Sequence, residues 1–153
     1  MQFHVIKAGA GRQRTACAIV GIHENATMTD STRQLDRASG GAIARLLRRG
    51  DFAGKSGETL PIVAARRGPA ERLLLVGLGP RSGFGRKAYR RAVFAATQWL
   101  AKSGATNAVS YLARDPIPGL ERDQRMRQPH NTRTNDDNSL RGCSGHERYQ
   151  FPH

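Results

Sequence analysis

The chain has 153 residues, of which 38% are hydrophobic, and its 25 Lys and Arg residues against 12 Asp and Glu give it a formal charge of +13. This length suits one domain, no run approaches the ~20 consecutive apolar residues of a membrane span, and 2 cysteines are too few for a disulfide scaffold. Residues 1–10 lack the apolar segment of a secretory signal, so we expect a cytoplasmic protein of a reducing compartment, without membrane contact.

Strand-like and helix-like runs alternate along the first 113 residues. The runs Phe3–Lys7 and Ala16–Ile22 predict strands, the second because it is rich in β-branched residues. A helix is predicted next, with Asp30 or Ser31 as its N-cap and Gly50 at its end, since apolar residues recur between them at helical spacing. The expected inner face of this helix consists of Leu35, Ser39, Ala42, Ile43, Leu46 and Leu47.

The second half of this region continues the alternation. Thr59–Ala64 predicts a short strand, which the proline near its start assigns to a sheet edge. Glu71–Val76 contains the run Leu73–Val76, which is apolar on both faces as in a strand buried inside a sheet. A second helix is predicted over Arg86–Ser103 and a last strand over Ala108–Leu112, so the order predicts an α/β sandwich with a mixed β-sheet flanked by helices. The expected apolar stripe of the second helix is Tyr89, Val93, Ala96, Trp99 and Leu100.

The composition of the chain changes near residue 113. In residues 114–153 only 7 of 40 residues are hydrophobic, and they follow neither the period of a strand nor that of a helix. Such a stretch buries too little apolar surface to offset the entropy of ordering its backbone. We therefore predict a folded domain over residues 1–113 and a mostly disordered tail over residues 114–153.

Two glycine-rich strings resemble phosphate-binding loops but depart from their patterns. Gly50–Ser56 has three residues between its glycines where a P-loop has four, and a helix precedes it where a strand should. Gly77–Gly83 follows a strand, but its third glycine comes one place late, Pro80 lacks an N–H, and no acidic residue follows ~20 positions on. We favour a helix-to-strand connection for the first string and a packing turn for the second, with nucleotide binding as the alternative for each.

No residue is predicted to be catalytic or to bind a metal. Only Cys143 and His146 have the spacing of zinc ligands, and both fall in the predicted tail. The acidic residues of the first 113 do not cluster as a two-metal site requires, and no spacing of serine, histidine and aspartate orients a nucleophile beside a base. We therefore expect no cofactor in this chain.

Two groups of cations lie near the ends of the predicted helices. At the end of the first helix, cations interact favourably with the helix dipole, by ~0.3–1 kcal/mol each. At the start of the second helix the dipole disfavours them, which invites an anion such as a nucleic-acid phosphate, a phosphorylated ligand or a carboxylate. The alternative is a solvated basic face. The candidate contacts are Arg86, Lys87, Arg90 and Arg91 at the second helix, and Arg45, Arg48, Arg49 and Lys55 at the first.

Three stretches of the chain carry a family pattern. The first runs from Leu35-Asp36 through Gly40-Gly41 into the string Gly50–Glu58, the second is Arg72–Gly79, and the third is Phe84 with Lys87–Arg90 at the start of the second helix. In this order they resemble the N-terminal domain of the leucyl aminopeptidase (cytosol aminopeptidase) family over residues 1–113. The resemblance implies a three-layer, macro-domain-like α/β sandwich.

The resemblance also implies where the chemistry of the family lies. Its members hold two divalent metal ions, zinc or manganese, in a C-terminal domain with a catalytic Lys and Arg, and they assemble as homo-hexamers. The string nearest to their Asn-Thr-Asp-Ala-Glu-Gly-Arg-Leu motif is Asn131–Thr134, which lacks the two metal-binding carboxylates. No functional residue of the family is therefore carried over to this chain.

The resemblance stops near Ala113, where the composition also changes, so we expect a frameshift or a truncation there. Two functions stay open. The first is the non-catalytic N-terminal domain of a leucyl aminopeptidase, a metallo-exopeptidase that releases N-terminal residues from peptides, which leaves this chain without activity of its own. The second is a stand-alone basic module that binds nucleic acid or a phosphorylated ligand.

Overall fold

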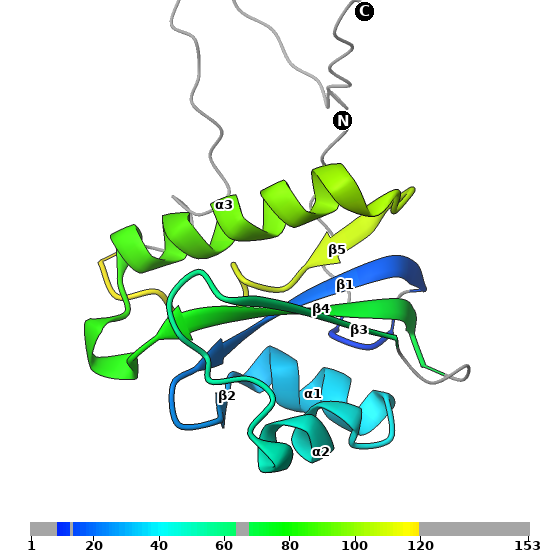
Figure 1. Cartoon of the computed structure of the whole chain (residues 1–153), viewed down its shortest axis with the longest axis horizontal. Helices are drawn as coiled ribbons and strands as arrows, with labels where there is room; N and C mark the ends of the chain where they lie inside the picture. Colours follow the sequence, from blue (N-terminus) through cyan, green and yellow to red (C-terminus); the bar gives the residue numbers. More distant parts are fainter. Residues whose placement is uncertain (1–8, 13, 64–67, 120–153) are drawn as a thin grey trace, which may run out of the picture.

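The structure, a computed structural model, describes residues 9–12, 14–63 and 68–119. In these ranges a mixed β-sheet lies between two helical layers (Figure 1). Helix α3 (Arg86–Ser103) covers one face of the sheet, and helices α1 (Asp30–Ala38) and α2 (Ala42–Arg49) cover the other. The predicted α/β fold, a three-layer sandwich with a mixed sheet flanked by helices, is confirmed.

Five strands form the sheet in the described ranges: β1 (Thr15–His23), β2 (Thr27–Met28), β3 (Thr59–Val63), β4 (Ala70–Gly79) and β5 (Ala108–Ser110). Their order is β2, β1, β4 and β3, and β5 also pairs with β1. β1 is parallel to β4 and β5, whereas β2 and β3 are antiparallel to their neighbours. β3 lies at an edge, as its proline predicted. β2 has 2 residues, too few for a hydrophobic pattern, and was not predicted.

β4 separates two hydrophobic cores. Leu73 and Leu75 belong to the core beneath α1 and α2, and Leu74 and Val76 belong to the core beneath α3. All four side chains are fully buried, which agrees with the strand buried on both faces that the sequence predicted. β4 continues past its predicted end because the glycine residues after Val76 still pair with β1.

The single helix predicted from the Asp30 region to Gly50 is wrong, because the structure divides it into α1 and α2. Gly40 and Gly41 lie between them with φ of 69° and 75°, in the left-handed region that interrupts a right-handed helix and that glycine adopts readily. The helical spacing of the apolar residues continues across this break, so periodicity alone could not reveal it. The predicted end at Gly50 agrees with the structure, where this residue follows the last turn of α2.

Thr29 is the N-cap of α1. The prediction that Asp30 or Ser31 is the N-cap is therefore wrong. Thr29 Oγ1 accepts a hydrogen bond from the backbone N–H of Thr32 at 3.3 Å. Asp30 lies in the first turn instead, where its carboxylate pairs with Arg33 at 3.1 Å. All three residues are of types that cap helices well, so the sequence could not choose among them.

The buried carboxylate of Asp36 caps the start of α2. Its Oδ1 accepts hydrogen bonds from the backbone N–H of Ile43 at 2.8 Å and from that of Ala44 at 3.1 Å. Its backbone carbonyl accepts from the N–H of Gly41 at 2.8 Å. A single residue of α1 thus fixes the direction in which α2 leaves the turn, and it places an anion at the positive end of the α2 dipole.

Helix α3 has the predicted bounds, but its buried face is rotated from the prediction. Ala92 and Ala96 are its buried residues, whereas Val93, expected in the apolar stripe, is 37% exposed. The two alanines let the helix backbone lie close to the sheet. Among the described residues, no helix combines the length and the hydropathy that a membrane span requires. The other residues of the expected stripe are partly buried against the same core: Tyr89, Trp99 and Leu100.

The packed region continues past Ala113, the expected end of the domain. Ile117 is 3% exposed and lies in the core beneath α3, and the carboxylate of Asp115 accepts a hydrogen bond from the N–H of Ser31 at 3.3 Å. A lone apolar residue without periodicity could not predict this contact. The division of the chain into a domain and a tail stays a prediction. Outside the described residues lie the predicted strand Phe3–Lys7 and residues 120–153 of the predicted tail.

Leu74→Ala should lower the free energy of unfolding by ~2–5 kcal/mol, because it removes a fully buried side chain from β4. Arg48→Ala, at an exposed position of α2, should change it by no more than ~0.5 kcal/mol. Urea unfolding followed by circular dichroism measures both values. A loss below ~1 kcal/mol for Leu74→Ala would contradict the central place of β4.

Asp36→Ala should lower the free energy of unfolding by ~0.5–2 kcal/mol, because two N–H groups at the start of α2 lose their acceptor. Asp30→Ala is the matched control, since the Asp30 side chain is 78% exposed and exposed ion pairs contribute ~0–1 kcal/mol. The same unfolding experiment compares the two variants. Equal losses would show that the Asp36 cap contributes nothing beyond an exposed carboxylate.

Candidate functional site

Open α/β sheets bind their ligands outside the carboxyl ends of the parallel strands. In this structure the connection from α2 to β3 crosses that edge beside the end of β4. The N–H of Gly79 donates a hydrogen bond to the carbonyl of Gly54 at 2.9 Å, and the N–H of Gly57 donates to the carbonyl of Gly77 at 3.0 Å. The backbone of the chain itself therefore occupies the edge where a ligand would be expected.

The two glycine-rich strings of the sequence meet at this crossing. A side chain at Gly77 would overlap the carbonyl oxygen of Lys55, and a side chain at Gly54 would stand 2.5 Å from the carbonyl oxygen of His23. The N–H groups of Gly77 and Gly79 donate to the backbone carbonyls of Glu58 and Gly54, whereas a P-loop directs such groups at a phosphate. The geometry agrees with a helix-to-strand connection for the first string and a packing turn for the second.

The histidine at the end of β1, His23, contacts the end of β4 at the same crossing. His23 is 7% exposed, and its Nδ1 lies 3.2 Å from the carbonyl oxygen of Gly79. Its ring meets the ring of Phe84 edge to face, with 5.0 Å between the centroids and 84° between the planes. A proton on Nδ1 makes this contact a hydrogen bond that holds the ends of β1 and β4 together, so the arrangement is that of a structural histidine.

The carboxylates of the domain do not fit a metal site. Within the described ranges, no three residues of the types His, Cys, Asp and Glu converge as ligands of one ion. The carboxylates of Asp36 and Asp30 are engaged at the helix starts, and Glu58 Oε2 accepts a hydrogen bond from the N–H of Lys55 at 3.0 Å. One oxygen of each of these carboxylates is engaged, and the three lie in different parts of the fold. Cys143 and His146 lie outside the described residues.

The free cysteine of β1, Cys17, is fully buried. Burial raises the pKa of the Cys17 thiol, and the charge of Arg72 offsets part of that effect. A thiol with a raised pKa is a poor nucleophile at neutral pH. Cys17 is therefore a packing residue of the core beneath α3.

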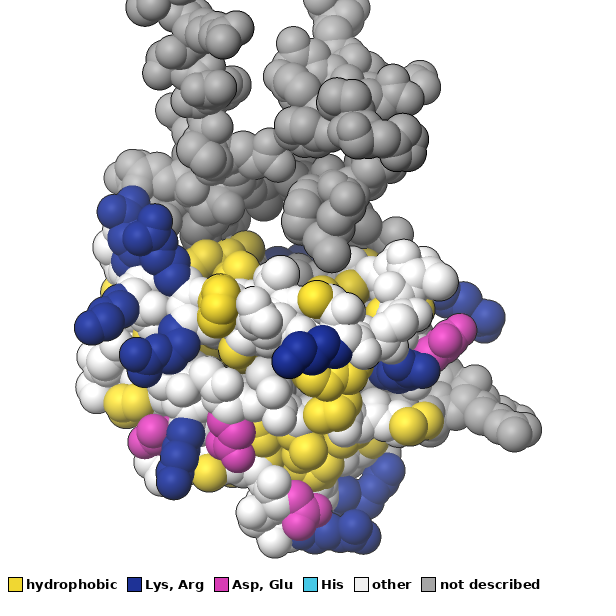
Figure 2. Space-filling model, turned by 45° about the horizontal axis from the view of Figure 1, so that its top comes forward, with side chains coloured by type: hydrophobic (Ala, Val, Ile, Leu, Met, Phe, Trp, Pro, Cys, Tyr) yellow, Lys and Arg dark blue, Asp and Glu magenta, His cyan; other side chains and the backbone are white. Residues whose placement is uncertain are grey.

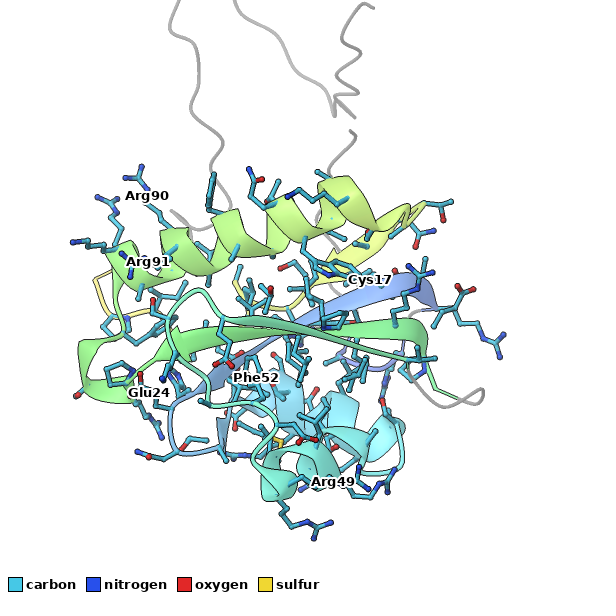
Figure 3. The ribbon with its side chains drawn as sticks, in the orientation of Figure 1. Cys17, Glu24, Arg49, Phe52, Arg90 and Arg91 are labelled. Atoms are coloured by element: carbon cyan, nitrogen blue, oxygen red, sulfur yellow. The ribbon has the colours of Figure 1, made fainter. Side chains whose placement is uncertain are left out.

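The structure does not bring the eight candidate anion contacts together. Arg90 and Arg91 lie at the start of α3, and Arg49 lies at the end of α2 on the other side of the sheet (Figure 3). Lys55 lies in the crossing connection, where a side chain at Gly57 would stand 3.3 Å from Cγ of Arg91. The connection thus runs beside the cations of α3. The remaining candidates follow their helices: Arg86 and Lys87 on α3, Arg45 and Arg48 on α2.

The cations at the start of α3 differ in their surroundings from Arg45 of α2. Arg86, Lys87, Arg90 and Arg91 are exposed, and none of them forms an ion pair with another described residue. On α2, by contrast, the guanidinium of Arg45 donates to the carbonyl of Gly40 at 2.8 Å. Figure 2 shows basic side chains gathered at one end of the α3 layer. Their contact with an anion stays a prediction.

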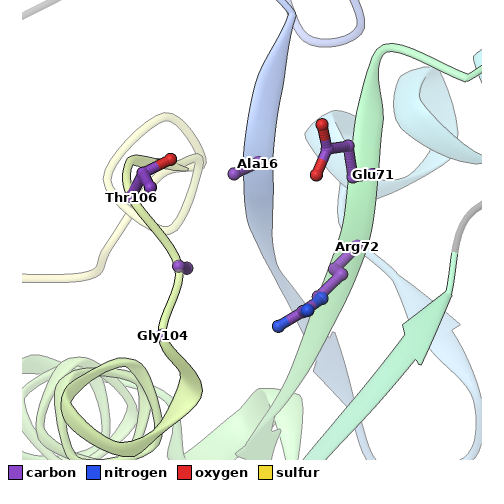
Figure 4. A pocket seen from close by; sticks show the side chains of 6 residues that line it. Ala16, Glu71, Arg72, Gly104 and Thr106 are labelled. Carbon is purple, nitrogen blue, oxygen red and sulfur yellow. The ribbon is translucent and has the colours of Figure 1, made fainter.

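A shallow pocket of about 110 Å³ lies between β1, β4 and the end of α3 (Figure 4). The guanidinium of Arg72, which lines it, donates from Nη1 to the carbonyl of Ser103 at 3.1 Å. A wider hollow of about 570 Å³ adjoins it, and its charged residues Arg14 and Glu71 are exposed. Ligand sites of ~300–1,000 Å³ enclose their ligand and aim a few polar groups at it. Neither hollow has that construction.

One surface feature of α3 was not predicted from the sequence. Val93 and Phe94 of α3 are 37% and 66% exposed, although both are large and apolar. A sequence signal was present, because no residue from Ala92 to Ala101 carries a charge. Helical spacing alone assigned Val93 to the buried face of the helix, so the exposure of these two apolar side chains was not predicted.

Comparisons with known proteins agree with the pattern seen in the sequence. The family model described as "Cytosol aminopeptidase family, N-terminal domain" matches residues 19–123. Probable cytosol aminopeptidases of Thioalkalivibrio sulfidiphilus and Halorhodospira halophila are 40% and 38% identical to the chain over 121 residues, which is 79% of this chain and 24% of each relative. The chain therefore spans about a quarter of the length of the curated relatives it matches.

Two solved structures resemble the fold. A mutant of the tomato leucine aminopeptidase is 25% identical, with a TM-score of 0.51 over 65% of this chain and 20% of that one. The macrodomain of Mycobacterium tuberculosis DarG has a TM-score of 0.57 at 7% identity, over 78% of this chain and 81% of that one. The second likeness concerns the fold alone and confirms the macro-domain-like sandwich. The chain belongs to the cytosol aminopeptidase family, whose N-terminal domain it contains.

Proposed function

We propose that this chain acts as the non-catalytic N-terminal domain of a metal-dependent leucyl aminopeptidase, an enzyme that releases N-terminal residues from peptides. The match of residues 19–123 carries the proposal, because the family domain it identifies makes up about a quarter of each relative. In these relatives the domain is one part of a longer protein. The homo-hexameric state and the cytoplasmic location that the resemblance implies belong to the same proposal.

The geometry supports a non-catalytic role. The connection from α2 to β3 bonds to the backbone at the end of β4, on the edge of the sheet where an α/β domain binds ligands. Among the described residues, no three His, Cys, Asp or Glu side chains converge as ligands of one ion, and the carboxylates of Asp36 and Glu58 bond to backbone N–H groups. Zinc or manganese would bind to the catalytic domain of such an enzyme and supply its hydrolytic chemistry there.

Binding of nucleic acid or of a phosphorylated ligand is not favoured as the main function. The eight candidate cations lie on both helical layers, with the sheet between them. A frameshift or truncation after Ala113 stays a prediction. Translation of the genomic DNA past residue 113 in the other two frames tests it, and the absence of an aminopeptidase sequence in both frames would refute it.

The purified chain should not hydrolyse leucine p-nitroanilide in the presence of Zn²⁺ or Mn²⁺. The second protein is a chimera in which residues 1–123 of this chain replace the matching N-terminal region of the Thioalkalivibrio sulfidiphilus relative. This chimera should hydrolyse leucine p-nitroanilide. The reason is that the catalytic residues come from the relative, whereas the fold of the domain comes from this chain. Absorbance of released p-nitroaniline measures both rates.

The unmodified relative is the positive control, and a chelator such as EDTA defines the metal-dependent part of the rate. Chelator-sensitive turnover that elutes with the chain alone would contradict the non-catalytic role. A chimera that folds but has no activity would contradict the assignment of this chain to the N-terminal position of such an enzyme.

A further inference from the structure

The backbone of strand β3 has one side that no described strand covers. β3 is the last strand in the order of the sheet, and within the described ranges it pairs with β4 alone. A strand at the edge of a sheet presents a row of N–H and C=O groups to any other extended chain, including the same strand of a second copy. Val63, at the end of β3, adds an apolar side chain that is 85% exposed.

The register of the β3–β4 pair shows which residues of β3 face outward. In an antiparallel pair, residues whose backbone groups bond to the partner strand alternate with residues whose backbone groups point away from it. The N–H of Gly77 donates to the carbonyl of Glu58 at 2.7 Å, so the backbone of Glu58 faces β4. Leu60 and Ile62 follow at steps of two residues and face β4 as well. The residues between them turn their backbone groups away from the sheet: Thr59, Pro61 and Val63.

The backbone of β4 shows the same alternation. The carbonyl of Gly77 accepts from the N–H of Gly57 at 3.0 Å, and the N–H of Gly79 donates to the carbonyl of Gly54 at 2.9 Å, so both residues of β4 bond on the side of β3. Leu75 continues this alternation and lies opposite Leu60. The outward position of the residues next to Leu60 follows from either strand.

Pro61 stands at the centre of the outward row. Proline has no backbone N–H, so the middle donor of this row is missing. The proline removes no hydrogen bond of the β3–β4 pair, because its nitrogen faces away from β4. Its side chain is exposed. The edge strand thus keeps its inner pairing and lacks the central donor of an outer one.

Without this proline, β3 fits the same strand of a second copy. A two-fold axis at position 61 makes the two strands antiparallel and brings Thr59 of one copy opposite Val63 of the other. Threonine and valine favour extended pairing, and the strand Thr59–Val63 contains no charged residue that would repel a copy. In this register the two residues at position 61 would exchange both of their hydrogen bonds, and proline cannot donate either.

We propose that Pro61 keeps β3 from pairing with the β3 edge of a second copy of this chain. The missing N–H removes the central pair of the ladder that would join the two sheets. This role belongs to the sandwich itself and does not depend on the proposed function.

Pro61→Thr in the full chain tests this role, because it restores the central N–H. The mass measured by sedimentation equilibrium should rise roughly twofold over that of the wild-type chain, since a two-fold pair uses the β3 edge of both copies. Pro80→Thr is the matched control, because it replaces an exposed proline that lies outside the strands, and it should leave the mass unchanged. Val63→Lys added to Pro61→Thr should restore the wild-type mass, because a lysine on an edge strand opposes pairing.

Hydrogen exchange of the wild-type chain checks the edge without a substitution. The amides of Leu60 and Ile62, which face β4, should exchange at least about tenfold more slowly than those of Thr59 and Val63. In Pro61→Thr the amides of Thr59 and Val63 should slow by about tenfold, because pairing covers them. The unfolding temperature of Pro61→Thr at low concentration should stay within about 5 °C of the wild-type value, since such a change acts chiefly through the unfolded chain.

Four results would overturn the inference. The first is a folded Pro61→Thr chain with the mass of the wild type. The second is slow exchange of Thr59 and Val63 in the wild-type chain, which would show that the edge is already paired. Association of Pro61→Thr that persists after Val63→Lys would place the contact on another surface. A Pro61→Thr chain without folded circular dichroism would make the proline a requirement of the sandwich rather than a guard of its edge.

Discussion

The crossing of the α2–β3 connection over the end of β4 is the contact on which the rest of the structure depends. It needs two positions without side chains, Gly54 and Gly77, because backbone atoms of neighbouring residues fill the space where a Cβ would lie. The N–H of Gly77 also donates to the carbonyl of Glu58 at 2.7 Å, one residue before β3 begins. The register of the edge strand, and with it the cover of the core beneath α1 and α2, follows from this close approach.

Elements with a strong local signal were predictable from the sequence, and those decided by a single residue were not. The run Leu73–Val76 has no polar position, so its burial on both faces follows from composition alone. The bounds of α3 follow from Gly85 and Gly104, which flank a long run without glycine or proline. The break at Gly40-Gly41 was hidden because the apolar spacing stays in phase across it, so only the backbone conformation shows it.

The residue types of the candidate site could be predicted, but their grouping could not. The cations were visible in the sequence, yet which side of the sheet each occupies depends on the order of the strands and the hand of the connections. Val93 was assigned to the core because helical spacing fits it as well as it fits Ala92. The choice between them depends on how closely the helix approaches the sheet, and two alanines on the inner side allow a close approach that turns the larger residues outward.

The two helical layers place their cations at opposite ends of helix dipoles. The arginines at the end of α2 stand at the negative end of a helix dipole and in water, where each is stable without a partner. On α3 the cations stand at the positive end, and Phe94 is exposed to solvent. The helices of the two layers carry equal numbers of Lys and Arg residues, so an arginine excess that arose from composition alone accounts for the charge of both, and the helix dipoles decide where each charge is stable without a partner.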